Sequence, residues 1–388
     1  FLPFSVRVTS TTRLSLVLRL RVRYPFLSRL FIFVVRVPTV TCSSPAIRSA
    51  SLRASSAHSS SVMPAIGISG STSALTLADA GYEVTLIVPG KELDGGNSAL
   101  AQGGIVYRSD PNDAKDLEKD ILIAGHHHNY VKAVRHLCQH GPEAVERILM
   151  ERAPIPFDRL DGKLDFTREG GHGKHRIVHC ADHTGKTIME GLLQAVRMSP
   201  NIRILTGRTA VDLITTDHHA RYKEYRYQLD NQCLGAYVYN EDTREVETLL
   251  ADFTVLATGG VGQVYLHTTN TAACTGSGIA MAQRAGVRLD NLEYVQFHPT
   301  ALYTRQSHSF LITEAMRGEG ARLTNAKGEF FMKRYDERAD LAPRDIVARA
   351  IMDEMLHSGE PCMYLDVSGV KHDRALFIPP QTRRIRLQ

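Results

Sequence analysis

Hydrophobic positions from about residue 65 onward follow first the spacing of a helix and then that of a strand. Ala74, Leu75 and Ala78 recur at helical intervals, which predicts a helix over residues 71–80. Gly81 ends this helix, because glycine readily takes the left-handed conformation found after helix C-termini. The apolar run over residues 82–88 then reads as a strand. A helix that leads into a buried strand in this way is typical of an α/β protein.

The same spacing predicts further elements along the chain. Helical patterns cover residues 113–124 and 130–150, and another helix opens within residues 275–282. A last helix begins at Arg344 beside a proline. A β-rich stretch lies between these helices, with strands expected over residues 202–205, 210–215, 225–229, 235–239 and 253–258.

A glycine-containing turn precedes the first helix. Gly67 and Gly70 occupy two positions of a G-x-G-x-x-G turn, while Ala65 stands where the first glycine belongs. Residues 61–64 make a poor first strand, because Pro64 cannot donate to a sheet ladder. In isolation this turn is weak evidence for a dinucleotide site. A second glycine-rich loop, residues 95–105, offers backbone N–H groups to an anionic ligand, although such loops are often plain surface loops.

Composition and charge divide the chain into two parts. It has 388 residues, 43% hydrophobic and 22% charged, enough for two globular domains. Residues 1–62 contain nine Arg, thirteen Ser and no Lys, Asp or Glu, and subtracting nine positive charges from the net +5 leaves −4. The remainder is mildly acidic, which gives no argument for nucleic-acid binding.

The Arg- and Ser-rich leader, residues 1–62, has two interpretations that stay open here. Its composition is typical of an organelle transit peptide, which would place the protein in a plastid or another organelle. Alternatively it is upstream sequence translated in frame, with a natural start near Met63 and a cytoplasmic protein. Its most apolar piece, residues 31–35, is too short to span a membrane.

Cysteines and histidines give no clear metal site. The six cysteines include no C-x-x-C pair, so we expect neither a disulfide framework nor a thiolate-rich metal centre. His172, His175 and His179 are close in sequence, but their loop context favours a reading without a metal.

Three separated motifs carry the chemistry. His298 is followed by proline, which disfavours a helical conformation at that histidine. Thr313 and Glu314 precede a Gly-Glu-Gly turn, and Arg344 opens its helix. Imidazole, hydroxyl and guanidinium together would clamp a small dicarboxylate, because arginine binds carboxylate as a planar fork. Taken one at a time, His298 would be a structural histidine and Arg344 a helix-start salt bridge.

These motifs, residues 293–302, 313–320 and 341–350, resemble the flavoprotein family of succinate dehydrogenase, fumarate reductase and L-aspartate oxidase. The resemblance implies a Rossmann-like FAD-binding domain over residues 63–291 and an α+β capping domain over residues 292–370. Residues 371–388 read as an unrelated tail. A full family member would continue with a His-x-x-x-Gly-Gly segment, a Gly-Glu flavin contact and a second substrate arginine, so the chain is expected to be truncated.

The resemblance also implies the cofactor contacts. The residues expected to bind FAD are Gly67, Gly70, Asn97, Ser98, Gln102, Gly103, Gly104, Thr258 and Gly259. Respiratory members attach FAD through a histidine where this chain has Asn97, so FAD is expected to be non-covalent. Ser277 replaces the family's aspartate in a Gly-Asp-Gly turn, which puts one contact in doubt.

By the same resemblance, His298 and Arg344 hold the substrate carboxylates, and Thr313 and Glu314 complete the pocket. Glu169 is expected to pair with the ammonium of L-aspartate, a charge that succinate lacks. Residues 164–172 and 175–185 resemble the aspartate-oxidase version of these loops.

The implied reaction is FAD-dependent oxidation of L-aspartate to iminoaspartate, with O₂ or fumarate as acceptor. It would be the first step of NAD biosynthesis, with quinolinate synthase as a possible partner. Two alternatives remain: a fumarate reductase or succinate dehydrogenase-like flavoprotein, or a catalytically inactive remnant.

Overall fold

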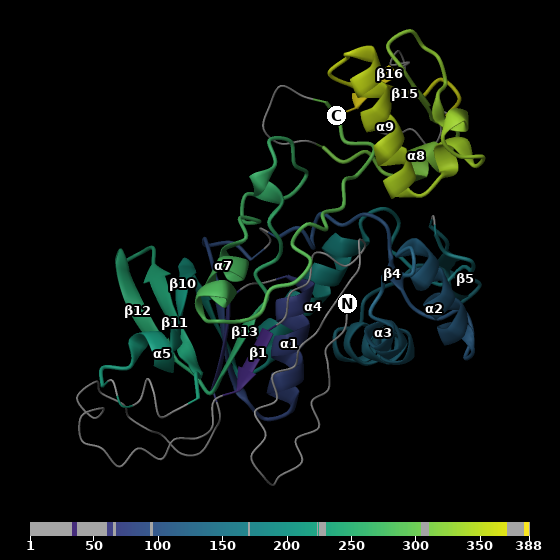
Figure 1. Ribbon diagram of the computed structural model, residues 1–388. Helices are drawn as coiled ribbons and strands as arrows, with labels where there is room; N and C mark the ends of the chain where they lie inside the picture. Colours follow the sequence, from purple (N-terminus) through teal and green to yellow (C-terminus); the bar gives the residue numbers. More distant parts are fainter. Residues whose placement is uncertain are drawn as a thin grey trace.

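A five-stranded sheet forms the centre of the computed structural model, which describes residues 33–36, 60–64, 67–93, 96–169, 171–222, 224, 230–303, 310–370 and 384–387. Four strands run parallel and the edge strand β1 runs antiparallel. In spatial order the strands are β1 (Phe33–Arg36), β13 (Phe253–Leu256), β2 (Ser60–Pro64), β3 (Glu83–Val88) and β9 (Ile202–Thr206). Figure 1 shows the helices α1 (Ile68–Asp79) and α4 (Thr184–Met198) beside this sheet.

The prediction that residues 61–64 are a poor strand is wrong. Strand β2 lies inside the sheet, where Val62 pairs with both Thr85 of β3 and Thr254 of β13. Pro64 is the last residue of β2, so its missing N–H falls at the end of the ladder, where it costs little. The expected domain start at residue 63 therefore lies within a strand.

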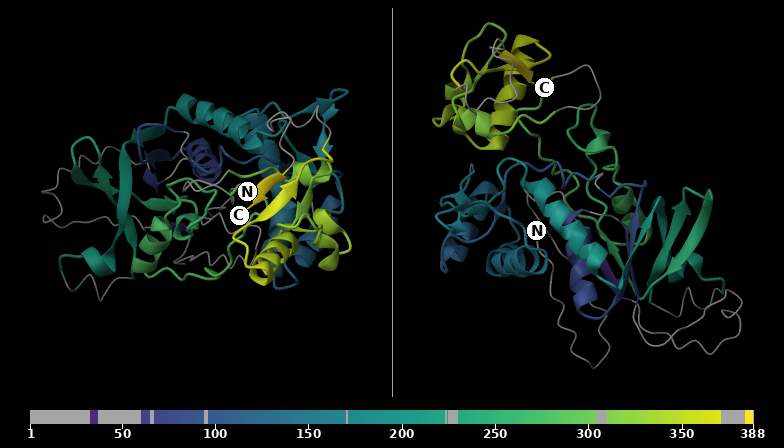
Figure 2. Two further views of the ribbon diagram at one scale, coloured as in Figure 1. Left: turned by 90° about the horizontal axis from the view of Figure 1, so that it is seen from above. Right: turned by 180° about the vertical axis from the view of Figure 1, so that it is seen from behind.

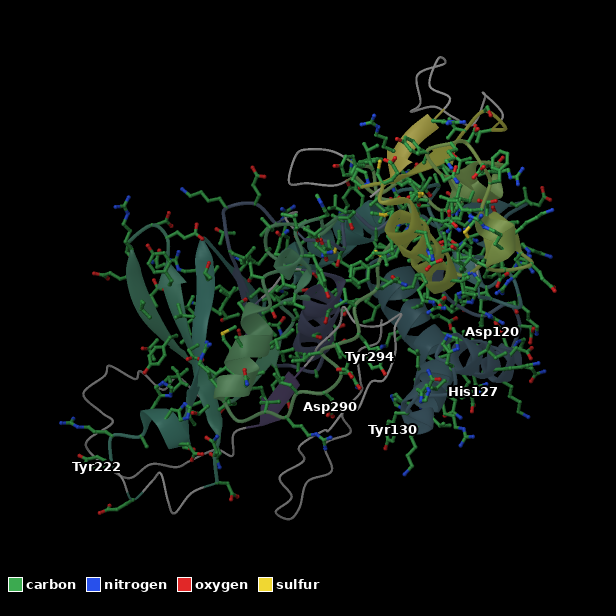
Figure 3. All side chains as sticks on the ribbon, turned by 45° about the horizontal axis from the view of Figure 1, so that its top comes forward. Asp120, His127, Tyr130, Tyr222, Asp290 and Tyr294 are labelled. Carbon is green, nitrogen blue, oxygen red and sulfur yellow. The ribbon has the colours of Figure 1, made fainter. Side chains whose placement is uncertain are left out.

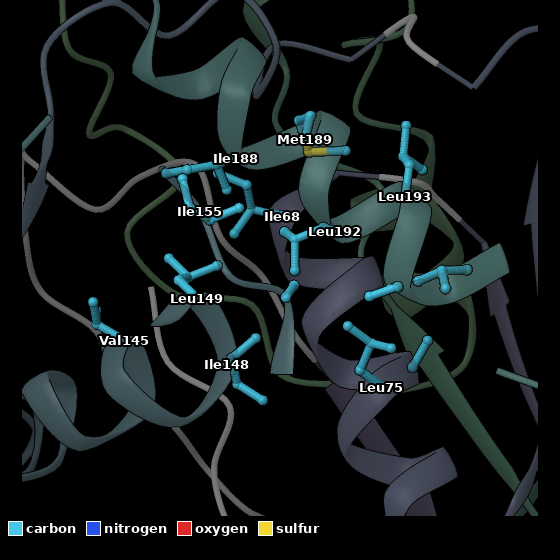
Figure 4. Close-up of a cluster of buried hydrophobic side chains, with 14 of the residues drawn as sticks. Ile68, Leu75, Val145, Ile148, Leu149, Ile155, Ile188, Met189, Leu192 and Leu193 are labelled. Atoms are coloured by element: carbon cyan, nitrogen blue, oxygen red, sulfur yellow. The ribbon is translucent and has the colours of Figure 1, made fainter. Parts of the chain in front are cut away.

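The largest core lies where α1 and α4 meet the π-helical segment η2 (Val145–Arg152), which continues α3 (Val131–Ala144). Leu75 of α1 and Leu192 of α4 are completely buried in it, as Figure 4 shows. Burial of each such leucine contributes about 1.5–3 kcal/mol. This core fixes the two helices whose N-termini face the site described below.

A second, antiparallel sheet packs beside the first through its own apolar cluster. It consists of β10 (Arg208–Thr215), β11 (Cys233–Asn240) and β12 (Glu245–Leu250), and α5 (Thr216–His219) follows β10. The expected strands over residues 210–215 and 235–239 are confirmed. The edge strand β12 was not predicted, because its exposed and polar residues give no apolar strand pattern. The strand expected over residues 225–229 lies outside the described residues.

On the other side of the molecule lie α2 (Asp113–Ala124) and α3, as Figures 1 and 2 show. Both helices are confirmed. Several short strands connect this region to the site: β4 (Ile105–Val106), β5 (Arg159–Leu160), β6 (Lys163–Leu164), β7 (Phe166–Thr167) and β8 (Ile177–Val178). The loop between β7 and β8 carries Glu169.

The C-terminal part forms a cap with a separate apolar core. Figures 1 and 2 show it on the α2 side, away from the sheet β10–β12. Its elements are α8 (Ala315–Gly318), β14 (Arg322–Thr324), α9 (Arg344–Ser358), β15 (Met363–Asp366) and β16 (Arg384–Leu387), with 3₁₀ turns η4 (Met332–Arg334) and η5 (Ala339–Leu341). The expected fold class, α/β with an α+β cap, is confirmed.

Strand β16 comes from the segment expected to be an unrelated tail. It pairs antiparallel with β15, and Leu387 is completely buried in the cap core. Exposed Arg384 and Arg386 alternate with the more buried Ile385 and Leu387, which is the pattern of a half-buried strand. These four residues therefore belong to the cap. Within the described residues, no helix has the length and apolar character needed to cross a bilayer.

Candidate functional site

One cleft of about 2150 Å³ extends from the central sheet to the cap. Ligand pockets usually measure roughly 300–1,000 Å³, so this cleft has room for a dinucleotide together with a small substrate. All but one of the predicted site residues line it: Gly67, Asn97, Ser98, Gln102, Gly103, Gly104, Glu169, Thr258, Gly259, His298, Thr313, Glu314 and Arg344. The exception is Gly70, which is buried in the first turn of α1.

The start of α1 is shaped for an anion. Gly67 caps the helix in an extended conformation and supplies no side-chain cap. Ser98 approaches from the glycine-rich loop, and its hydroxyl accepts a hydrogen bond from the Ile68 N–H at 3.2 Å. A Cβ at Gly67 would lie 3.1 Å from the Ser98 Oγ, which is tight. The positive end of the helix and the N–H groups of its first turn are suited to phosphate.

Two other helices begin at the cleft. Helix α4 starts at Thr184, whose hydroxyl donates to the Gly103 carbonyl at 2.5 Å and accepts from the Cys180 N–H at 2.9 Å. Helix α7 (Ser277–Arg284) starts after Gly276, which has a left-handed φ of 79°. Ser277, the first residue of this helix, lines the cleft. The helix ends add positive potential around the cleft.

Besides two guanidinium nitrogens of Arg317, three buried polar atoms of cleft residues lack hydrogen-bond partners among the described residues. They are the Ser69 hydroxyl, the Gln102 carbonyl oxygen and the Thr271 hydroxyl. Most buried polar groups in folded proteins are paired. A polar ligand in the cleft would satisfy these atoms, so the residues present fit FAD.

Asn97 joins the glycine-rich loop to the segment after β13. Its Nδ2 donates to Asn270 Oδ1 at 2.6 Å, and its Oδ1 accepts from the Thr271 N–H at 2.7 Å. The same Nδ2 lies 2.9 Å from Cys274 Sγ. Asn97 therefore positions two walls of the cleft. The expectation that FAD is non-covalent stays a prediction.

A row of alternating charges crosses from the base of the cleft to the cap. Arg344 opens α9 as predicted, its Nε donates to Glu314, and its Nη2 lies 3.5 Å from Glu169 Oε2. Glu314 Oε1 in turn lies 3.1 Å from Arg317 Nη2. Burial raises the pKa of Glu169, although Arg344 opposes the shift. Glu169, Arg344 and Glu314, which the sequence placed in one pocket, are brought together.

Arg317 is a site residue that the sequence reasoning missed. Only 3% of it is exposed, and it lines the cleft. Its Nη1 donates to the Asp340 carbonyl at 2.6 Å, while Nε and Nη2 lack an aligned hydrogen bond. Burial lowers the pKa of its guanidinium, and Glu314 opposes this. The motif that contains it was recognised, but only Thr313 and Glu314 were given roles.

His298 lies in the same cleft, next to a short turn. Its Nδ1 accepts from the Thr300 N–H at 3.3 Å, which leaves the ring in a defined orientation. Gln296, two residues earlier, also lines the cleft and was not predicted.

The loop with Glu169 is anchored from behind by a buried ion-pair network. Arg176, with none of its side chain exposed, binds Asp113 through two nitrogens and Asp120 at 2.5 Å. Asp120, labelled in Figure 3, also accepts from the Gly173 N–H at 2.8 Å. Because Gly173 follows Glu169 by four residues, this network fixes the backbone that presents the carboxylate.

The three histidines of this region have separate partners. His172 contacts Arg176 at 3.1 Å, His175 contacts the Phe166 carbonyl at 3.2 Å, and His179 lies 3.1 Å from Asp158. In the described part of the chain, no cluster of three or more ligating side chains has the geometry of a metal site.

Comparisons with known proteins identify the family and the fold. The model of the FAD binding domain family matches residues 66–377. The chain belongs to this family of FAD-binding flavoproteins. Its fold is similar to that of an E. coli quinol fumarate reductase, with a TM-score of 0.73 and 24% identity over 86% of this chain and 60% of that chain. FAD as the cofactor is thereby confirmed.

The resemblance to L-aspartate oxidase is also confirmed. The chain is 45% identical to L-aspartate oxidase of Pseudomonas aeruginosa, over 80% of this chain and 57% of the relative. It is 37% identical to the chloroplastic L-aspartate oxidase of Arabidopsis thaliana, over 88% of this chain and 52% of the relative. The chain thus spans about half the length of these relatives. Most of the leader lies outside the described residues, so the localisation stays a prediction.

Proposed function

We propose that the whole protein oxidises L-aspartate to iminoaspartate with FAD. The observation that carries this proposal is the pair Glu169 and Arg344, which face each other at 3.5 Å in the cleft. An α-amino acid presents an ammonium and a carboxylate, and these two side chains offer one opposite charge to each. The names of the similar proteins support the same substrate.

The residues of the cleft divide into two groups. Gly67, Ser98 and the start of α1 would hold the pyrophosphate, and Gln102 and Thr271 would bind polar edges of the cofactor. When bound, FAD supplies a hydride acceptor. Gly103 belongs to the residues expected to bind FAD and also lies against Glu169, because a Cβ at Gly103 would collide with the Glu169 carboxylate. The proposed ammonium site is therefore next to the glycine-rich loop.

The substrate residues orient rather than react. Arg344 would bind one carboxylate, with its own orientation fixed by Glu314, and His298 and Thr313 would bind the other. Glu169 would hold the ammonium, so that the Cα–H bond has one direction in the cleft. Glu169 and Arg344 are partly buried, and each charge interaction is stronger there than in bulk water. Oxidation removes a hydride from Cα and a proton from nitrogen.

O₂ or fumarate would take the two electrons in turn, giving peroxide or succinate. Iminoaspartate would be passed to quinolinate synthase on the way to NAD. The acceptor and this partner belong to the proposal.

Turnover of the FAD-loaded protein tests the reaction. With L-aspartate in air we expect equal amounts of peroxide and of oxaloacetate, to which the imine hydrolyses in water. Absence of both products, from protein that demonstrably carries FAD, would contradict the proposal.

A succinate dehydrogenase or fumarate reductase activity is the second candidate, favoured by the structural similarity to quinol fumarate reductase. The two differ in substrate. Fumarate formed from succinate, with no product from L-aspartate, would establish the second candidate instead.

A further inference from the structure

We propose that an amino-acid zwitterion replaces the Glu169–Arg344 ion pair charge for charge, whereas a dicarboxylate without an ammonium binds only together with one proton on Glu169. This inference deepens the proposed function and rests on it, since it takes the cleft as the substrate site. It states whether Glu169 is ionised or protonated when each class of ligand is bound.

The two side chains come from different parts of the fold. Glu169 lies on the β7–β8 loop of the base, and Arg344 is the first residue of α9 in the cap. Their side chains are 35% and 23% exposed, and Nη2 and Oε2 are 3.5 Å apart. In the cleft each charge therefore has the other as a partner.

A zwitterion can enter this pair without leaving a charge unpaired. Its carboxylate takes the place of Glu169 beside Arg344, and its ammonium takes the place of Arg344 beside Glu169. Succinate offers Arg344 a carboxylate but brings no cation to Glu169. An ionised carboxylate that loses its partner and its water is costly, and such a group takes up a proton instead.

The surrounding charges favour that protonation. Burial raises the pKa of Glu169, and Glu314, just before α8, raises it further, while Arg344 opposes both. Glu314 itself is paired with Arg344 and Arg317. His172 of the same loop is held by Arg176 and has a pKa lowered by burial. A dicarboxylate that occupies Arg344 weakens the one interaction that keeps Glu169 ionised.

The two ligand classes should respond to pH in opposite directions. Above the pKa of Glu169 in the ligand-free protein, the dissociation constant of succinate should rise about tenfold per pH unit, because one proton must be taken up. Below that pKa it should be constant. L-Aspartate needs ionised Glu169, so its affinity should be constant above this pKa and fall below it.

Calorimetry on the full FAD-loaded chain measures the proton directly. The flavin is first reduced under anaerobic conditions, so that L-aspartate cannot be oxidised during the titration. Succinate and L-aspartate are each titrated at several pH values near neutrality, in two buffers with different ionisation enthalpies. We expect uptake of about one proton per succinate and none per L-aspartate.

Two variants identify the group that takes the proton. Glu169→Gln should abolish the proton uptake on succinate binding and the pH dependence of the succinate dissociation constant. It should also weaken the binding of L-aspartate. Glu143→Gln, at an exposed position paired with His140, is the matched control and should change neither. The wild-type pH slopes test the inference even if Glu169→Gln does not fold.

Succinate binding without proton uptake, proton uptake that persists in Glu169→Gln, or no succinate binding at any pH would overturn the inference. Failure of the proposed function looks different. If L-aspartate is oxidised while succinate binds without a proton, only this inference falls. If succinate binds with a proton on Glu169 while L-aspartate is not oxidised, the proposed function falls.

Discussion

At the scale of single residues, Glu169 is the side chain to which we assign the choice between L-aspartate and a dicarboxylate. Its carboxylate lies between Gly103 of the glycine-rich loop and Arg344 of the cap. The sequence predicted it from its loop, and the structure brings it to the same cleft as Arg344. Arg317 was missed because only tertiary packing reveals that a helix-end arginine is buried with unused donors.

Glu169→Gln should impair L-aspartate oxidation more than fumarate reduction in a version of the protein that turns over both. Loss of one charge-assisted hydrogen bond costs about 1.5–3 kcal/mol, which is roughly 10- to 150-fold in kcat/KM for L-aspartate. Steady-state kinetics with both substrates measures this. Equal losses would mean that Glu169 only holds its loop in place.

Gly103→Ala tests the contact between the flavin loop and Glu169. The new methyl group would overlap with the Glu169 carboxylate and force it out of position. A forced rotamer costs about 0.5–1.5 kcal/mol, so KM for L-aspartate should rise by roughly two- to tenfold. Gly318→Ala is the control, since a Cβ there meets nothing within 4 Å. An unchanged KM in Gly103→Ala would remove Glu169 from the substrate site.

At the scale of elements, periodicity predicted the helices well and the sheet edges poorly. α2 spans the residues expected, because its apolar positions repeat at helical spacing. β12 and β16 were missed, since short strands with polar outer faces resemble loops in sequence. β2 was rejected because of Pro64, whose place at the strand end only the sheet register reveals.

The ion-pair network around Arg176 connects α2 to the loop of Glu169, and we expect Arg176→Met to lower the unfolding free energy. Removing one member of a buried ion pair costs about 3–5 kcal/mol of unfolding free energy, because Asp113 is left buried without its partner. Chemical denaturation measures the change. Arg135→Met breaks an exposed pair with Glu118 and should cost about 0–1 kcal/mol. Similar losses in both variants would argue against the anchoring role.

The same network should weaken in acid. Burial alone would raise the pKa of Asp113, but hydrogen bonds from Arg176 and Ser109 outweigh it, and the pKa is held below its usual value. Asp113 therefore stabilises the fold above its unfolded-state pKa and loses this contribution as pH falls through its lowered folded-state pKa. The unfolding free energy of Arg176→Met should show less of this acid dependence than the wild type. An identical pH profile would assign the acid sensitivity to other groups.

At the scale of the whole molecule, the part built on the central sheet carries the residues proposed to bind FAD, and the cap carries Arg344, Glu314 and Arg317. The sequence predicted this division from motifs, while the way in which Asn97 and Arg176 position the walls required the structure. Because Asn97 stands where respiratory members attach FAD through a histidine, and a carboxamide cannot form that bond, we expect FAD to be released intact when the protein is denatured and filtered. Flavin that stays with the polypeptide would contradict non-covalent binding.

The central claim is that the cleft uses Glu169 and Arg344 to present an amino acid to FAD. Anaerobic addition of substrate to the FAD-loaded chain tests it most directly, because loss of the oxidised flavin absorbance reports hydride transfer without any acceptor. We predict that L-aspartate bleaches the flavin and that succinate, at the same concentration and neutral pH, does so far more slowly or not at all. Bleaching by succinate in preference to L-aspartate would contradict the account.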